Sequence, residues 1–205
     1  WADELAQEVA VFGESGSGKT VMLSSFFGGS QEPDFRNSSL YRVVAESPEQ
    51  RDRLHRNYLR MKEDAHRPEP TRFMSKPFRF RVKVKHSSDP SRGTSGYDAL
   101  QLLWHDYPGD WFAQDVSGSE EEQDRIATFR ALLGADVALL LVDGQKLRDS
   151  TGEEERYLKR LMRGMRGMLE SLEDDLLKDG KLIEFPRIWI LALSKADLYP
   201  GADVY

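Results

Sequence analysis

Hydrophobic runs alternate with amphipathic segments along most of the chain, and this alternation predicts strands followed by helices. Short apolar runs at residues 8–12, 135–143 and 187–194 are typical of buried parallel strands. Residues 78–86 alternate apolar and basic side chains, which indicates a half-exposed strand at a sheet edge. Residues 97–106 predict a strand that pairs with it as a hairpin. The pattern favours an α/β domain with a mostly parallel sheet and one antiparallel edge strand.

Helices are predicted between these strands. The first begins at Lys19 and is expected to stop at Gly28-Gly29. A capping sequence at Ser47 predicts a helix to about residue 66, and similar sequences at Ser119 and Thr151 begin two further helices. The last of these has apolar residues at helical spacing, namely Leu158, Leu161, Met165, Met168, Leu172 and Leu176. Residues 30–45 show little periodicity, so we expect a helical insertion or a switch segment over about residues 30–75.

The amino-acid composition indicates how many domains, which partners and which cellular location to expect. The 205 residues suit a single domain, and 29 basic against 35 acidic residues give a net charge of −6. That balance gives no general attraction to nucleic acid, so no nucleic-acid partner is expected. The chain has no cysteine and no apolar run near the roughly 20 residues that span a bilayer, so we expect a cytoplasmic protein without a transmembrane segment. Because it starts without methionine or a signal peptide, we expect an excised fragment.

The connection between the first strand and the first helix carries the clearest chemistry. It reads Gly13-Glu14-Ser15-Gly16-Ser17-Gly18-Lys19-Thr20 and matches G-x-x-x-x-G-K-[ST] in full. The glycines let successive backbone N–H groups point at phosphate oxygens, and the helix adds its positive end. Lys19 would supply a point charge to the β- and γ-phosphates, and the Thr20 hydroxyl a magnesium ligand. The alternative is a Gly/Ser connector that contains a lysine by chance.

A second candidate segment, Asp106-Tyr107-Pro108-Gly109, ends a predicted strand. An acidic residue there can hold magnesium, usually through water. A glycine three residues later lets its backbone N–H approach a γ-phosphate closely. Taken alone, the tetrapeptide is equally typical of a strand followed by a turn, so its functional interpretation depends on the phosphate-binding pattern before it.

A third segment, Ser194-Lys195-Ala196-Asp197, directly follows the last apolar run. The Asp197 carboxylate can accept two hydrogen bonds from the N1 and N2 edge of guanine, which adenine does not offer. The aliphatic stem of Lys195 can lie along the base. The alternative is a polar turn between a strand and a helix.

The three segments, in this order, resemble a P-loop GTPase of the translation-factor-related class, and "DYPGDW" is similar to the bacterial YcjX-like branch. The resemblance implies a three-layer, Ras-like fold that binds GTP or GDP with Mg²⁺. It assigns Lys19 and Thr20 to phosphate and magnesium, and Asp106 and Gly109 to sensing the γ-phosphate. Ser194, Lys195 and Asp197 would contact guanine. It also implies that a further strand follows in the family, so the domain is expected to be truncated at its C-terminus.

The sequence departs from the family's pattern at three places. Ser194 stands where the base motif usually opens with Asn or Thr, and its hydroxyl has less reach. Asp110 stands where many members have a water-orienting glutamine or histidine, and a carboxylate beside a triphosphate predicts slow hydrolysis. Thr71 precedes the alternating strand, as a switch threonine would, and is a candidate magnesium ligand and catalytic residue.

Two functions of different classes follow. The first is a GTP-hydrolysing switch whose mobile segments are read by a protein partner. The second is a non-hydrolysing nucleotide-binding scaffold or sensor within a larger protein, which Asp110 favours. An ATPase or kinase is a third alternative, but it would leave Asp197 without a role.

Overall fold

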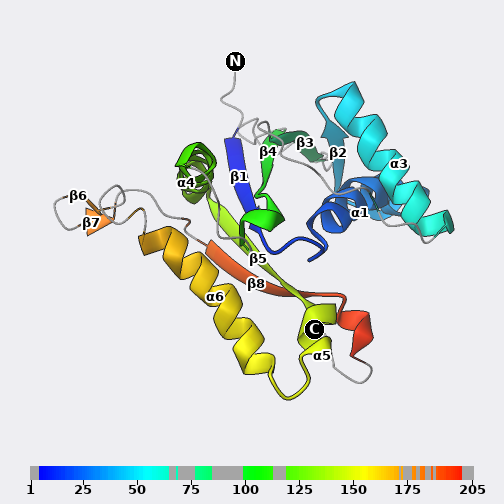
Figure 1. Ribbon diagram of the computed structural model, residues 1–205. Coiled ribbons are helices and arrows are strands. Elements are labelled where there is room, and N and C mark those ends of the chain that lie inside the picture. Colours follow the sequence, from blue (N-terminus) through cyan, green and yellow to red (C-terminus); the bar gives the residue numbers. More distant parts are fainter. Residues whose placement is uncertain are drawn as a thin grey trace. The chain divides into compact units, whose positions relative to one another are not determined.

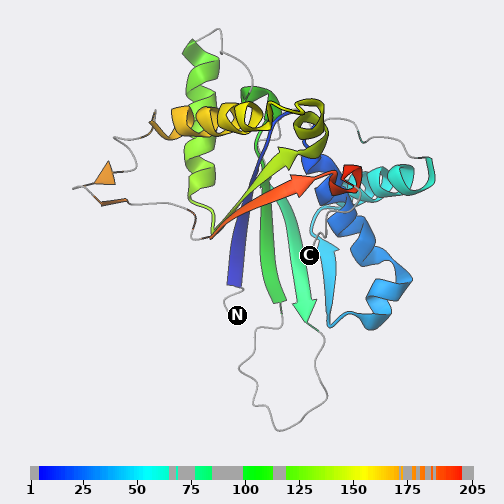
Figure 2. The same ribbon diagram turned by 90° about the horizontal axis from the view of Figure 1, so that it is seen from below.

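The computed structural model describes residues 5–64, 68, 77–84, 99–112, 119–170, 172, 177–178, 181–182, 186 and 188–199. These residues form an α/β structure with a six-stranded sheet in the order β2-β3-β4-β1-β5-β8 (Figures 1 and 2). The sheet strands are β1 (Leu5–Phe12), β2 (Tyr41–Ala45), β3 (Phe78–Val84), β4 (Ala99–Asp106), β5 (Val137–Asp143) and β8 (Ile188–Ser194). A separate antiparallel pair joins β6 (Leu177–Lys178) and β7 (Lys181–Leu182). The predicted α/β class with a mostly parallel sheet is therefore confirmed.

The helices lie between these strands as the alternating pattern predicts. They are α1 (Lys19–Gln31), α2 (Pro33–Ser38), α3 (Pro48–Asp64), α4 (Ser119–Leu133), α5 (Gly144–Asp149) and α6 (Glu154–Glu170), with 3-10 turns η1 (Gly109–Phe112) and η2 (Ala196–Leu198). The chain folds as two compact units, the first comprising Trp1–Glu8 and Thr20–His105, the second Val9–Lys19 and Asp106–Tyr205. The second unit holds most of the sequence-predicted site.

In the first unit, the predicted hairpin is confirmed, because β3 and β4 pair antiparallel with Phe78 opposite Trp104 and Lys83 opposite Ala99. The prediction that residues 78–86 form the sheet edge is wrong. β3 also pairs antiparallel with β2, which takes the edge position. The five residues of β2 follow the short helix α2 too closely for any periodicity to be visible in the sequence. Residues 30–45, expected to be irregular, are thus mostly helix and strand.

The first helix also differs from its prediction. α1 continues through Gly28-Gly29 to Gln31 instead of ending there. Gly28 lies against α3, and a Cβ at this position would come within 2.1 Å of the Tyr58 ring. The glycine therefore permits close packing of two helices rather than ending one. The predicted start of α3 is confirmed, since Ser47 Oγ accepts a hydrogen bond from the Gln50 N–H at 3.4 Å.

In the second unit, β1, β5 and β8 pair in parallel. The register places Asp143 opposite Ser194, so the polar residues that follow both strands emerge at the same end. The core beneath them combines strand, helix and loop side chains; its largest members are Phe12, Tyr107, Phe129, Leu133, Met165 and Met168. The rings of Phe12 and Tyr107 are tilted, with centroids 5.5 Å apart, and both contact the Phe129 ring edge-on. This core fixes the strand ends that carry the candidate site.

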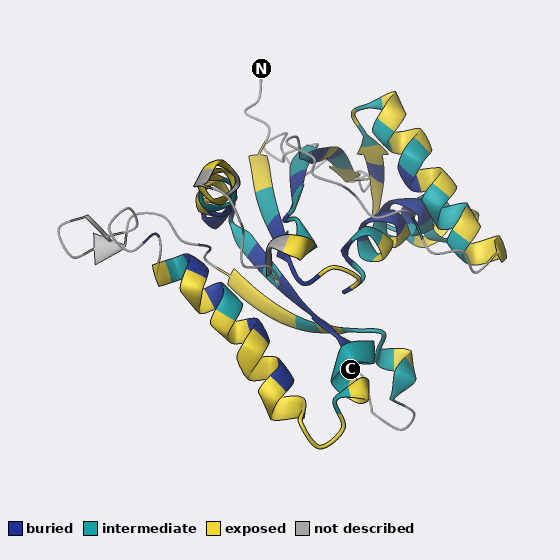
Figure 3. Ribbon diagram, in the orientation of Figure 1, coloured by how far each residue is buried: buried dark blue, intermediate teal, exposed yellow. Residues whose placement is uncertain are grey.

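Three expectations for the second unit are wrong. Thr151 was predicted to cap the helix α6, which begins at Glu154, but Thr151 Oγ1 instead donates to the Arg148 carbonyl at 2.6 Å and closes the turn after α5. Leu158 was expected on the apolar face but lies at its border, 37% exposed. β8 was expected to be buried, yet it is the last strand in the sheet order and Leu191 is 66% exposed. Figure 3 shows most of this strand as exposed.

Candidate functional site

The loop Gly13–Gly18 connects β1 to Lys19, the first residue of α1. Gly16 and Gly18 have φ angles of +82° and +96°, which side-chain-bearing residues rarely adopt. The Ser17 N–H donates to the Glu14 carbonyl at 3.1 Å and closes a turn within the loop. The backbone is therefore curled, as the sequence pattern requires, and this curl is what lets several N–H groups face a bound anion.

Lys19 folds back over this loop. Its Nζ donates to the carbonyl oxygens of Gly13 at 2.7 Å and Glu14 at 3.2 Å. Burial lowers the pKa of the Lys19 ammonium, while the carboxylates of Asp106 and Asp110 oppose that shift. The Lys19 ammonium is partly removed from water beside the curled loop. A phosphate group bound there would stabilise this charge in place of the lost hydration.

The segment after β4 is fixed against this loop. The Tyr107 N–H donates to the Val11 carbonyl at 3.0 Å, and the Tyr107 ring is fully buried in the core. Gly109 follows so close to the loop that a Cβ there would lie 2.4 Å from the Ser15 backbone nitrogen. The sequence-predicted partners Gly13–Lys19 and Gly109 are therefore brought together within one compact unit.

This close approach yields a testable prediction. Gly109→Ala should weaken binding of any phosphate ligand and lower the free energy of unfolding, because the added methyl group meets backbone atoms that cannot rotate away. Gly167→Ala is the matched control, since the helical Gly167 has open space around its Cβ position. That control should raise the free energy of unfolding by about 0.5–1 kcal/mol. Chemical denaturation measures both, and equal behaviour of the two variants would contradict the close approach.

The third predicted segment begins beside the loop. An ideal Cβ on Gly18 would lie 3.6 Å from Ser194 Cβ, and Ser194 Oγ donates to the Val142 carbonyl at 3.1 Å. Lys195 has a left-handed backbone with φ of 54°, the one positive φ among described non-glycine residues. Asp197 lies in η2, where the Leu198 N–H donates to the Lys195 carbonyl. Ser194, Lys195 and Asp197 thus extend from the same strand end that borders the curled loop.

Three residues of this region were not singled out from the sequence: Asp143, Lys146 and Tyr157. Asp143 is 2% exposed, and its Oδ1 accepts from Lys195 Nζ at 2.6 Å and from the Gln145 N–H at 2.9 Å. It therefore caps α5 and also holds the lysine of the third segment. Its position as the last residue of a buried parallel strand was the available signal, because ligands of such sheets bind at that end.

Magnesium would have to be held by few protein groups. Thr20 and Asp106 are the candidates, and Thr71, the third, lies outside the described residues. Among the residues that the structure describes, no three His, Cys, Asp or Glu side chains gather as a metal site. If magnesium binds here, Thr20 and Asp106 would hold it, and it would supply charge neutralisation to a bound phosphate group.

Asp110 follows Gly109 in η1 and is exposed. Its carboxylate opposes the lowering of the Lys19 pKa by burial, so its negative charge acts at the Lys19 ammonium. That Asp110 lies near a bound γ-phosphate stays a prediction, and so does its consequence for hydrolysis.

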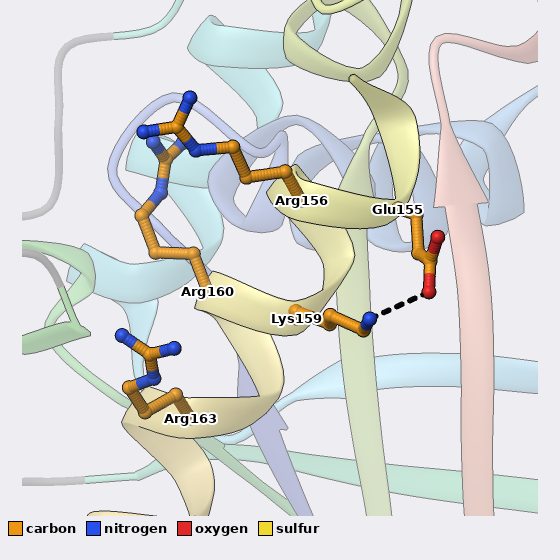
Figure 4. A pocket seen from close by; sticks show the side chains of 5 residues that line it. All are labelled: Glu155, Arg156, Lys159, Arg160 and Arg163. Carbon is orange, nitrogen blue, oxygen red and sulfur yellow. Dashed lines mark ion pairs between the residues drawn. The ribbon is translucent and has the colours of Figure 1, made fainter. Parts of the chain in front are cut away.

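A separate charged surface lies on α6. A hollow of about 440 Å³ is lined by Glu155, Arg156, Lys159, Arg160 and Arg163 (Figure 4). Local partners account for much of this charge: Lys159 pairs with Glu155 at 2.6 Å, and Arg156 with Glu153 at 3.2 Å. The Arg160 guanidinium lies 5.5 Å from the centre of the Tyr157 ring. None of the described residues lining this hollow belongs to the sequence-predicted site.

Comparison with protein-family models finds no match to this chain, and comparison with curated proteins finds no significant relative. Within the described residues, no helix combines the length and apolar character needed to cross a bilayer.

Proposed function

We propose that this chain is a magnesium-dependent GTP-binding domain with a Ras-like, three-layer P-loop fold, and that it hydrolyses GTP slowly as a molecular switch. The observation that carries the proposal is the curled Gly13–Gly18 loop with Lys19 folded over it and Gly109 against Ser15. These features are those that phosphate binding requires, and they come from segments almost a hundred residues apart in the sequence.

The third segment supports guanine as the base. Lys195 is held by Asp143, and η2 presents Asp197 two residues later. A carboxylate in this position can pair with the two N–H donors of guanine. Ser194 lies near Gly18, so base and phosphate groups would bind at one end of the sheet. Thr20 and Asp106 would hold the magnesium ion, which would supply charge neutralisation at the β- and γ-phosphates.

One titration tests the proposal. Fluorescent GTP, GDP and ATP analogues are added to the 205-residue chain with and without Mg²⁺, and released inorganic phosphate is measured in parallel. We expect guanine nucleotides to bind with Mg²⁺ and phosphate to appear slowly. GTP binding without any phosphate release would identify a non-hydrolysing module, and preferential ATP binding would contradict the assignment of guanine.

Asp197→Asn gives a separate prediction for the base. This change should weaken GTP binding at least about tenfold, since the loss of a charge-assisted hydrogen bond costs ~1.5–3 kcal/mol. Xanthosine triphosphate, which carries a carbonyl where guanine has an amine, should bind the variant better than it binds the original chain. Competition assays with the two nucleotides measure both changes. Equal affinity of the original chain for ATP and GTP would contradict the role given to Asp197.

A further inference from the structure

Glu14 brings a negative charge into the Gly13–Gly18 loop, and no other residue of that loop is charged. Its side chain is not directed to water, because the residue is only 6% exposed. A carboxylate this close to a phosphate-binding loop would repel a polyphosphate, and the repulsion grows as water is excluded. The loop can bind phosphate well only if this charge is compensated.

Lys146 of α5 provides that compensation. Its Nζ lies 2.9 Å from Glu14 Oε2, although the two residues are 132 positions apart in the sequence. The Tyr157 hydroxyl of α6 lies 3.3 Å from the same oxygen and also accepts from the Asp143 N–H at 3.3 Å. Glu14 is therefore held by two side chains, one of them cationic. The ion pair is anchored on the helix that Asp143 caps.

The charges of this pair reach the phosphate-binding lysine. Lys19 Nζ donates to the Glu14 carbonyl oxygen at 3.2 Å, and the Glu14 carboxylate is held by Lys146 at 2.9 Å. At this range the Glu14 carboxylate attracts the Lys19 ammonium, and the Lys146 ammonium repels it. The two side chains thus act on the Lys19 ammonium in opposite directions. An anion bound to Lys19 would experience the same two fields with opposite sign, attracted by Lys146 and repelled by Glu14.

We propose that Lys146 is a positioning residue of the nucleotide site, which neutralises Glu14 and thereby sets the affinity of the loop for polyphosphates. This inference rests on the proposed nucleotide-binding function. Its specific consequence is a dependence on phosphate charge, because an uncompensated carboxylate repels a triphosphate more than a diphosphate or a monophosphate. A purely structural role of Lys146 would instead affect all three nucleotides alike.

Calorimetric titration of four variants with GTP, GDP and GMP tests this. Lys146→Met should raise the dissociation constant for GTP about tenfold, with a smaller rise for GDP and little change for GMP. Glu14→Gln, which removes the repulsive charge and leaves Lys146 in place, should tighten GTP binding. The double variant with both changes should return to within about threefold of the original affinity. Lys159→Met removes the same charge from an exposed position on α6 and is the matched control.

Each outcome is decisive. Equal affinities for Lys146→Met and Lys159→Met would overturn the inference, as would equal weakening of GTP, GDP and GMP or a failure of the double variant to recover. If Lys146→Met does not fold, as judged by circular dichroism, tighter GTP binding by Glu14→Gln supports the inference and unchanged or weaker binding overturns it. The proposed function fails separately, and the inference with it, if the original chain shows no nucleotide binding that depends on Lys19.

Discussion

Lys19→Ala should reduce the affinity for guanosine triphosphate at least about 100-fold, because it removes charge-assisted contacts worth ~1.5–3 kcal/mol each from a partly desolvated site. Lys19 is 9% exposed, and its ammonium already donates to the loop carbonyls of Gly13 and Glu14. Lys146, a cation whose charge also acts on Lys19, is engaged by Glu14 at 2.9 Å. Lys146 could replace the charge of Lys19 only by breaking that pair.

Isothermal titration calorimetry measures this loss, and thermal unfolding checks that the variant remains folded. Lys159→Ala serves as the control, since this lysine is exposed on α6 and pairs only with the neighbouring Glu155 among the contacts described. Its removal should leave nucleotide affinity within about twofold, as expected for a screened surface charge. Unchanged affinity of Lys19→Ala would show that the loop does not bind phosphate as proposed.

The elements of the second unit could be predicted from the sequence because their signals are local and strong. β5 is a continuous apolar run, and a parallel strand covered on both faces requires such a run. β8 has the same kind of sequence, yet several of its side chains are exposed, since burial of a strand's faces requires other elements to pack on them. An apolar run therefore predicts a strand reliably, whereas its burial depends on what packs beside it.

The errors in the first unit have a different physical origin. Gly28 was interpreted as a helix end, but it allows α1 to pack against Tyr58 of α3, a contact between residues 30 positions apart. The edge position of the sheet belongs to β2, whose five residues are too few to show a period. Both features depend on tertiary contacts, which override local propensity.

The candidate site also contains some residues that the sequence reveals and others that it does not. The loop Gly13–Thr20 could be identified because its residues are contiguous and their spacing is set by the backbone curl. The group formed by Glu14, Asp143, Lys146 and Tyr157 could not, because its members meet only through the parallel register of the strands and the start of α6. Side chains that tune a site from a second element leave no spacing pattern in the sequence.

The purified chain should release phosphate at well below ~0.1 per second, because the position after Gly109 holds an aspartate rather than a group that orients water. Asp110 is exposed in η1, and its negative charge acts on the Lys19 ammonium. The same charge would repel a γ-phosphate bound beside Lys19. Intrinsic GTPases without a well-placed catalytic group are typically slower by several powers of ten than the same enzymes stimulated by a partner. We therefore expect single-turnover hydrolysis to be limited by chemistry at this position.

Asp110→Asn separates charge from geometry in that prediction. The amide keeps the size of the side chain and removes its charge, so hydrolysis should become faster if repulsion of the γ-phosphate is the obstacle. The change should be visible in the rate of phosphate release at saturating GTP. The affinity for GDP should change little, because GDP has no γ-phosphate. Asp124→Asn, a change of the same type on α4, is the control and should leave the rate unaltered. A fast rate in the original chain that falls in Asp110→Asn would show instead that the carboxylate positions the attacking water itself, acting as the general base.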